Sequence, residues 1–574
     1  MRVEFNVNIF EYMYPEIFFF TGFLFYFIYN LNSFTIVKVL SYRYDFLNFK
    51  NYKLSNFLVS PFAVFFGFVK NNVLGSQRIR EVFFQIFEKN SLIYISLLSL
   101  LTMILYIIQL IWQFDFLSND RGDGITFSIL NFTFLIDCFS ICFKIFITFM
   151  AFMFFLLVKH VSYFWKFYNA DFGFFVFMAV FSMLFLVSCG DFFIMYMALE
   201  VQTLSYVLLA SYQMGRLRSI ESGFKYFIYS AFFSVFFLMS IAFIYFVFGT
   251  VSFLDLRALV LGGFSVSFLN YIFVLSLLFI LSLFFFKLGV FPYHYWMADI
   301  YEGSNLLVTA FFAILSKIGL LAVYIRVLAT IFYGCDFGVL SYFFYMAILS
   351  MVFGVLLAYN QTNVKRFLAY TSVSNMGVVL ASCSLLDSVS VSGGIFFFVA
   401  YVFSLIGLFV FLLGIVSKDT LILNNGKFVD AYYADLSDVS FFKTFDDFKG
   451  LFRQSPEYAI ALLLILLNLS GLPPMIFFYA KYLVYIVLSG SDLYSIIFPY
   501  FLINMVSAYY YLRIIKNMFL DRQVESKLYF FYSRTLSVIF YCSAVLIFCC
   551  LFFYIPLLVY LFDFIEHLVF KLAV

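Results

Sequence analysis

Long apolar runs separated by short polar segments form the dominant pattern along the chain. The runs 92–114 and 267–286 contain no charged residue, and a membrane-spanning helix needs about 20 mostly apolar residues. The pattern predicts helices near 15–38, 92–114, 139–158, 172–189, 192–212, 224–248, 267–297, 304–327, 338–359, 364–385, 391–416, 457–487, 494–516 and 535–563. The sequence therefore predicts an all-α polytopic membrane protein with about fourteen transmembrane helices.

Two regions interrupt this pattern. Residues 39–91 contain a polar insertion, in which the apolar segment 55–69 is too short to span and is flanked by Lys53 and Lys70. Such a segment is typical of an interfacial or re-entrant element. The stretch 418–456 is polar and carries charges of both signs. It is interpreted as a solvated insertion, because exposed mixed-charge loops usually have no further role.

The charges in the loops support the predicted number of helices. Basic residues follow the odd-numbered helices, whereas acids dominate the even-numbered loops. The seventh loop, with Asp299 and Glu302, is the exception. Because Lys and Arg in short loops set the orientation of a membrane protein, both termini are predicted on the outer face.

Composition excludes several classes of function. Of the 574 residues, 65% are hydrophobic and 11% charged, and the mean hydropathy is +1.04. The net charge of +3 is spread over short loops, which argues against nucleic acid as a partner. The eight cysteines form no CxxC motif and only three histidines occur, so neither a zinc site nor a haem site is expected. No phosphate-binding loop and no cleavable targeting peptide is expected either.

Four ionisable residues lie well inside predicted spans: Glu200, Lys287, Lys317 and Lys481. An ionisable group near the bilayer centre costs several kcal/mol unless it is paired or hydrated, so each is a functional candidate. A membrane lysine can also extend its ammonium to the headgroups. That explanation fits Lys225, near the start of its helix, as well as a functional role does. It fits the other three lysines poorly, because each lies more than two helical turns from a loop on at least one side.

Three of the eight prolines lie close to these lysines. Pro292 follows Lys287, and Pro473 and Pro474 precede Lys481. A proline inside a helix releases the carbonyl four residues earlier, and the last two prolines would release those of Leu469 and Ser470. Because a free carbonyl at membrane depth needs protein or water as a partner, both helices are predicted to be broken around hydrated cavities.

A broken, lysine-bearing helix in each half of the chain is typical of transporters built from inverted repeats. The predicted repeats are helices four to eight, in residues 171–330, and helices nine to thirteen, in residues 331–520. Helices one to three (1–170) precede them and helix fourteen (521–574) follows. Helix ten carries Thr371, Ser372, Ser374 and Asn375. These side chains are expected either to hold water between the halves or to join packed helices.

The charges suggest a mechanism of proton transfer. A lysine beside a carboxylate keeps its proton, whereas a desolvated lysine without one releases it readily. We therefore expect Glu200 to pair with Lys287 in one state, and their separation to send a proton through Lys317 towards Lys481.

Several motifs resemble the antiporter-like subunits of respiratory complex I, and NADH dehydrogenase subunit 2 in particular. They are MYMALEVQTLSYVLLASY, FKLGVFPYHYWMADIYEGSN, NVKRFLAYTSVSNMGVVLAS and LSGLPPMIFFYAKYLVY, and matches run in order over about residues 130–490. The order Trp-x-x-Asp-x-Tyr-Glu-Gly is similar to subunit 2. Lys481 disfavours subunit 4, where a glutamate is usual.

The resemblance implies a proton-translocating subunit in the inner mitochondrial membrane. Its partners would be lipids and other membrane-arm subunits, including neighbouring antiporter-like ones. No cofactor is implied in this chain, since NADH, FMN, iron-sulfur clusters and ubiquinone belong to partner subunits. Glu200 and Lys287 would form the switching pair, Lys317 the central relay and Lys481 the outlet group, with Lys225 as an additional family lysine.

The sequence departs from the family pattern at some positions, and two other functions are possible. Asn375 stands where the family usually has a histidine, and residues 39–91 and 419–445 look like insertions. A non-conducting scaffold of the same complex and a stand-alone cation/proton antiporter subunit are the alternatives. Intact ionisable residues in the spans disfavour the scaffold.

Overall fold

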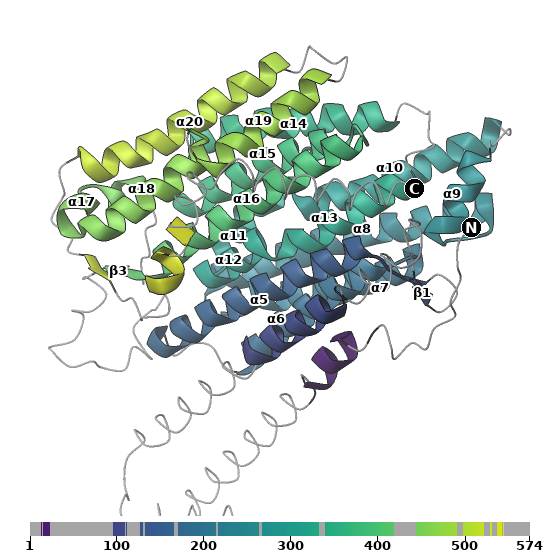
Figure 1. Cartoon of the computed structure of the whole chain (residues 1–574), viewed down its shortest axis with the longest axis horizontal. Helices are drawn as coiled ribbons and strands as arrows, with labels where there is room; N and C mark the ends of the chain where they lie inside the picture. The colour runs from purple at the N-terminus through teal and green to yellow at the C-terminus, as the bar shows by residue number, and fades with distance from the viewer. Residues whose placement is uncertain are drawn as a thin grey trace, which may run out of the picture.

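Helices make up nearly all regular structure in the described part of the chain, as the computed structural model in Figure 1 shows. The structure describes most of residues 13–24, 96–111, 127–262, 267–331, 339–417, 444–521 and 528–544. The insertion 39–91 with its apolar segment 55–69, nearly all of 419–445, Pro474 and most of the predicted helices 15–38 and 535–563 lie outside these residues.

The first half of the bundle follows two short helices, 15–22 and Ser96–Gln109. Its elements are α5 (Cys138–Trp165), α6 (Ala170–Ser188), α7 (Phe192–Ala210), α8 (Leu217–Phe248), α9 (Phe253–Leu261), α10 (Ser267–Leu288), α11 (Tyr295–Gly303), α12 (Leu306–Ile314) and α13 (Ser316–Thr330). Two three-residue strands, β1 (Phe127–Ile129) and β2 (Phe134–Ile136), form an antiparallel pair before α5.

Six long helices form the second half of the described bundle. They are α14 (Val339–Tyr359), α15 (Val364–Cys383), α16 (Ser388–Leu413), α18 (Pro456–Ser470), α19 (Ile476–Gly490) and α20 (Ile497–Phe519), with the short η4 (Phe445–Phe448) and α17 (Leu451–Gln454) before α18. Strands β3 (Ile415–Ser417) and β4 (Leu528–Phe530) pair antiparallel. Every predicted helix between 139 and 516 is therefore found as one helix or as two consecutive ones.

Eight of the described helical segments are long and apolar enough to cross a membrane. The other predicted spans in the described residues are shorter or more polar. The helix predicted at 457–487 consists of two pieces, α18 and α19, and α15 carries two basic residues and several hydroxyls. The polytopic helical fold predicted from the apolar runs is confirmed.

Both predicted broken helices are present. α10 ends at Leu288 and α11 begins at Tyr295, with Pro292 between them. α18 ends at Ser470 and α19 begins at Ile476. Each break starts with a glycine at positive φ, +73° at Gly289 and +72° at Gly471, a conformation that other residues rarely adopt.

One interruption was not predicted. The helix expected at 304–327 consists of α12 and α13, which are separated at Leu315. No proline marks this point. The hydroxyl of the next residue, Ser316, donates to the Phe312 carbonyl at 2.6 Å, and such back-bonding by serine often bends helices.

The α12–α13 span forms the centre of the bundle. Figure 1 shows it between α5 and α6 on one side and α14, α15 and α20 on the other, and it contacts α5 and α6 as well as α15 and α16. Of residues 306–330 all but Ala329 are buried, and no other candidate span in the described part of the chain is buried to this extent. α8 is the opposite case, because only 22% of its span is buried.

A polar bridge connects the two halves beside this centre. The Arg366 guanidinium at the start of α15 forms an ion pair with Glu302 of α11. The Lys365 ammonium donates to the Ser304 carbonyl at 2.6 Å. The end of α11 is therefore attached to the beginning of α15 by two charge-assisted contacts.

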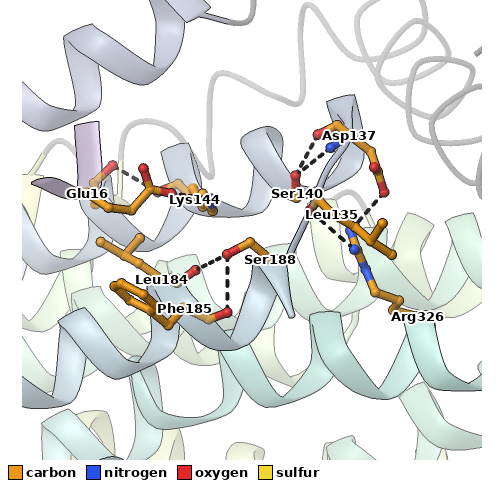
Figure 2. Close-up of polar contacts among 10 residues, drawn as sticks. Glu16, Leu135, Asp137, Ser140, Lys144, Leu184, Phe185, Ser188 and Arg326 are labelled. Atoms are coloured by element: carbon orange, nitrogen blue, oxygen red, sulfur yellow. Dashed lines mark hydrogen bonds and ion pairs between the residues drawn. The ribbon is translucent and has the colours of Figure 1, made fainter. Parts of the chain in front are cut away.

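Two ion pairs, one fully and one partly buried, attach α5 and the residue before it to other segments, as Figure 2 shows. Lys144 of α5 pairs with Glu16 of the first helix, and both side chains are 1% exposed. The Lys144 ammonium also lies 5.7 Å from the centre of the Tyr106 ring. At the start of α5, Asp137 accepts a hydrogen bond of 2.9 Å from Arg326 of α13. Three segments far apart in the sequence thus meet at α5.

A glycine allows α14 and α15 to approach closely. A Cβ atom at Gly354 would lie 2.6 Å from the backbone nitrogen of Ser374, so Gly354→Ala forces the helices apart. Overpacking of this kind costs about 1–3 kcal/mol. We expect Gly354→Ala to lower the thermal unfolding midpoint of the solubilised protein, measured by fluorescence. Gly490→Ala is the matched control, since nothing lies within 4 Å of its Cβ. Equal midpoints for the two variants would contradict this packing.

Candidate functional site

Lys287 is the last residue but one of α10 and lies in a buried aromatic environment. Its side chain is 3% exposed, and its ammonium lies 5.8 Å from the centre of the Tyr226 ring and 6.0 Å from that of Tyr206. Among the described residues the ammonium has no hydrogen-bond partner. Ring faces attract a cation, but they accept no proton from it. The Lys287 ammonium is therefore buried with aromatic rings beside it and, among the described residues, no hydrogen-bond acceptor.

The end of α10 holds this lysine in place. The Trp296 indole of α11 donates to the Phe286 carbonyl at 2.8 Å. The chain then leaves the helix through Gly289, whose left-handed conformation redirects the backbone. Consequently the break places the Lys287 side chain next to Tyr206 of α7 and Tyr226 of α8.

Glu200 lies on α7, one and a half turns before Tyr206. It is half-buried, and the Thr203 hydroxyl lies 3.4 Å from its carboxylate. Glu200 interacts electrostatically with Lys287, but no ion pair within 4 Å joins the two side chains among the described residues. The predicted partners are thus neighbours that are separated in this structure.

Lys317 is the second residue of α13, immediately after the interruption at Leu315. It is 1% exposed, and its ammonium has no hydrogen-bond partner in the described part of the chain. In the described part of the chain no hydrogen bond or ion pair joins it to Lys287 or to Lys481. Lys317 lies at the buried centre of the bundle, and its role as the relay between the other lysines stays a prediction.

Lys481 lies on α19, directly opposite the second break. Its ammonium donates to the Ser470 carbonyl at 3.0 Å and to the Ser507 hydroxyl of α20 at 3.4 Å. The Phe477 ring lies 5.3 Å away. The carbonyl of Ser470 is one of the two that the proline pattern marked as released. The broken helix thereby supplies an acceptor for a buried cation.

Lys225 has a different environment. It is 37% exposed and pairs with Glu221 at 2.8 Å and with Asp299 at 3.1 Å. An exposed ion pair of this kind contributes about 0–1 kcal/mol. The position resembles an ordinary surface lysine on α8, and a role in proton transfer stays a prediction.

At one end of α7, outside the span, two carboxylates come close. Burial and the neighbouring Asp255 raise the pKa of Asp191 from 3.8 to about 6. Ser252 donates to Asp255 and forms an isolated bridge with Asp191. Within the described ranges, no group of three or more histidine, cysteine, aspartate or glutamate side chains could hold a metal ion.

Sequence reasoning missed the tyrosines beside the lysines. Tyr206 and Tyr226 are buried, and Gln202 donates to the Tyr206 hydroxyl at 2.8 Å. With 44 tyrosines in the chain, nothing in the local pattern distinguishes these two. Tyr206 lies on α7 with Glu200, and Tyr226 lies on α8. Only the packing of these helices against the end of α10 brings both tyrosines to Lys287.

The sequence is similar to those of known membrane subunits. Residues 189–507 match the family model for the transmembrane region of NADH:quinone oxidoreductase and Mrp antiporter subunits. NADH-quinone oxidoreductase subunit N of Pelagibacter ubique is 32% identical over 348 residues, which cover 61% of this chain and 68% of that protein. NADH-ubiquinone oxidoreductase chain 2 of Marchantia polymorpha is 32% identical over 346 residues, 59% and 65% of the two chains.

Solved structures share the fold. A chain of respiratory complex I from Thermus thermophilus superposes with a TM-score of 0.61 at 22% identity and covers 82% of this chain and 96% of its own length. A chain of the Mrp complex from a Dietzia species has a TM-score of 0.64 at 17% identity, covering 85% and 93%. At these identities the superpositions show the fold alone.

Proposed function

Because the chain belongs to the family of NADH:quinone oxidoreductase and Mrp antiporter transmembrane subunits, we propose that it is a proton-translocating membrane-arm subunit of respiratory complex I. The relatives named subunit N and chain 2 support this assignment. The observation that carries it is Lys287, a buried ammonium beside a half-buried glutamate at a helix break. Such a group can change its protonation when its partner moves.

The mechanism begins with Glu200 and Lys287. While the carboxylate is near, its negative charge favours the protonated lysine. When the carboxylate withdraws or becomes protonated, the ammonium keeps only tyrosine rings and a desolvated environment, and it gives up its proton. The proton passes to Lys317 at the centre and to Lys481 as the outlet group. Lys481 can accept it because Ser470 and Ser507 stabilise its charged form.

The redox reactions take place in other subunits of the proposed complex. This chain supplies no redox chemistry; NADH, FMN, iron-sulfur clusters and ubiquinone are bound by partners, and neighbouring antiporter-like subunits flank the chain. It is a multi-pass membrane protein, and we place it in the inner mitochondrial membrane. The match to chain 2 of Marchantia polymorpha supports this location.

A cation/proton antiporter subunit is the second candidate, because the Mrp chain shares the fold as closely as the complex I chain does. Sequence favours complex I, since the curated relatives at about 30% identity are its subunits. Co-purification with flavin and iron-sulfur clusters distinguishes the two. Purification with neither would favour the antiporter.

Glu200→Gln tests the switching pair. An interaction of about 1–2 kcal/mol between partly buried charges corresponds to about a tenfold change in rate. We expect the complex to assemble and its proton pumping, measured with a pH-sensitive dye in vesicles, to fall by about tenfold. Asp446→Asn is the control, because Asp446 is 75% exposed and pairs only at the surface. Normal pumping by Glu200→Gln would rule out the pair as the switch.

A further inference from the structure

Two neighbouring helices of the second half, α14 and α20, each carry a row of exposed apolar side chains, and α20 lies at the edge of the bundle in Figure 1. The row on α14 consists of Tyr345, Leu349, Phe353, Leu356 and Tyr359, and that on α20 of Leu502, Met505 and Tyr509. Residues spaced by three or four share a helix face. The two helices pack against each other, and the ring centres of Tyr359 and Tyr509 lie 5.7 Å apart. The rows therefore meet at this tyrosine pair, and together they form the α14–α20 surface.

Two cations follow the apolar row on α20. Arg513 and Lys516 are exposed, and they lie four and seven residues after the last tyrosine of the row, so they continue it along the same face. Neither forms an ion pair within 4 Å with another described residue. Of the acids at this end of the bundle, Asp446 pairs with Lys449 at 2.7 Å, and Asp521 interacts electrostatically with the same lysine. The two cations are therefore available to an external anion.

A third exposed cation lies close to the end of α20. The ring centres of Phe452 on α17 and Phe519 on α20 are 4.9 Å apart. Phe519 follows Lys516 by three residues and so lies on its side of the helix. This contact brings α17, with the exposed Arg453, to the basic end of α20. The α14–α20 surface is thus uncharged along its rows and basic at one end.

We propose that the α14–α20 surface binds an anionic phospholipid, whose phosphate contacts Arg513 and Lys516 and whose acyl chains lie along the two apolar rows. Such a lipid has a negative headgroup followed by long apolar chains, which matches the order of basic and apolar side chains on α20. Basic residues directly beyond a membrane span attract anionic lipids. Tyrosines favour the level of the headgroups, and the Tyr359–Tyr509 pair lies next to the two cations. The site goes beyond the proposed function, because it requires no proton transfer.

Two simpler explanations account for only part of this pattern. Cations in the last turn of a helix interact favourably with the helix dipole, but that effect needs neither the apolar rows nor the tyrosine pair. A layer of lipid without preference for any headgroup covers apolar rows, but it needs no cations beyond them. Guanidinium and ammonium groups are common ligands of phosphate. The combination of both features therefore favours a lipid with a negative headgroup.

Photo-crosslinking tests the site in the full chain within its assembled complex, reconstituted into phosphatidylcholine vesicles. The probe is phosphatidylglycerol with a diazirine in one acyl chain, added as a minor component below saturation, and labelled residues are identified by mass spectrometry. We expect labels on Leu349, Phe353 and Met505. The double variant Arg513→Gln/Lys516→Gln should reduce this labelling by about thirtyfold, because each cation near the membrane surface contributes about a factor of five to the binding of an anionic lipid.

Two further variants separate the charge from other effects. Lys449→Gln is the matched control, because it removes a cation at the same end of the bundle that Asp446 already pairs, and it should leave the labelling unchanged. Arg513→Lys/Lys516→Arg keeps both charges and should be labelled like the unaltered chain.

Three results would overturn the proposal. Unchanged labelling of the double glutamine variant would show that the two cations do not hold the lipid. Equal labelling by a phosphatidylcholine probe would mean ordinary contact with the bilayer. No labelling by either probe would mean that another protein covers the surface. None of these results bears on proton transfer, which Lys287→Ala tests separately.

Discussion

Lys287→Ala is expected to reduce proton pumping by the assembled complex by at least about a hundredfold, the lower range for removal of a positioned acid–base group. Lys287 is a buried cation at the first break, and it interacts with Glu200. Alanine removes the amino group, so no group at this position can take up and release the proton. The measurement is NADH-driven proton uptake into vesicles, with electron entry checked through an artificial acceptor on the same sample.

Lys449→Ala is the matched control for this substitution. Lys449 is 33% exposed and pairs with Asp446 at 2.7 Å, three residues before it, an arrangement that contributes little. It should pump at the unaltered rate. If Lys287→Ala pumps as well as Lys449→Ala does, the chain serves as a scaffold and protons cross elsewhere in the complex.

Lys144→Met is expected to destabilise the N-terminal part of the bundle by about 3–5 kcal/mol, because it leaves the Glu16 carboxylate buried without its cation. Both partners are 1% exposed, and the second carboxylate oxygen of Glu16 already has no hydrogen-bond partner among the described residues. The measurement is the temperature at which the purified complex loses this subunit. A large downward shift is the expected result.

The double variant Glu16→Leu/Lys144→Met shows whether the charge is the cause. Replacing both members of a buried pair by apolar residues of similar size is often neutral or stabilising. We therefore expect the double variant to recover most of the stability that Lys144→Met loses. Equal losses in the single and the double variant would mean that packing around Lys144 matters and the ion pair does not.

Local signals explain most of what sequence reasoning could predict. The breaks at Pro292 and Pro473 follow from the missing amide hydrogen of proline, and both lie where the pattern placed them. The helix interruption at Leu315 was missed because neither proline nor glycine marks it. The Ser316 hydroxyl donates to a carbonyl four residues earlier, but hydroxyls in uninterrupted helices do the same.

The ion pairs of Lys144 and Arg326 were not predicted because their partners lie far away in the sequence. Lys144 lies in the first third of α5, where a lysine is easily taken for one near a helix end. Its partner Glu16 is 128 residues away in the sequence, so the local pattern does not reveal the pair. Arg326 lies near the end of the helix predicted at 304–327, yet its side chain is 1% exposed and donates to Asp137, 189 residues away. Spacing within one helix carries no information on such partners. The same holds for Tyr206 and Tyr226, whose rings lie 6.1 Å apart because α7 and α8 pack together.

The contacts at the boundary between the two halves oppose a movement of one half against the other. A carrier that rocks one half against the other has to open a doorway wide enough for its cargo. Here α12–α13 lies between the two halves and is almost completely buried, and the Glu302–Arg366 pair and the Lys365 contact to Ser304 join α11 to α15 beside it. A rocking movement of one half against the other has to break these contacts. Proton transfer does not require such a movement, because a proton passes between oxygen and nitrogen atoms that need only reorient.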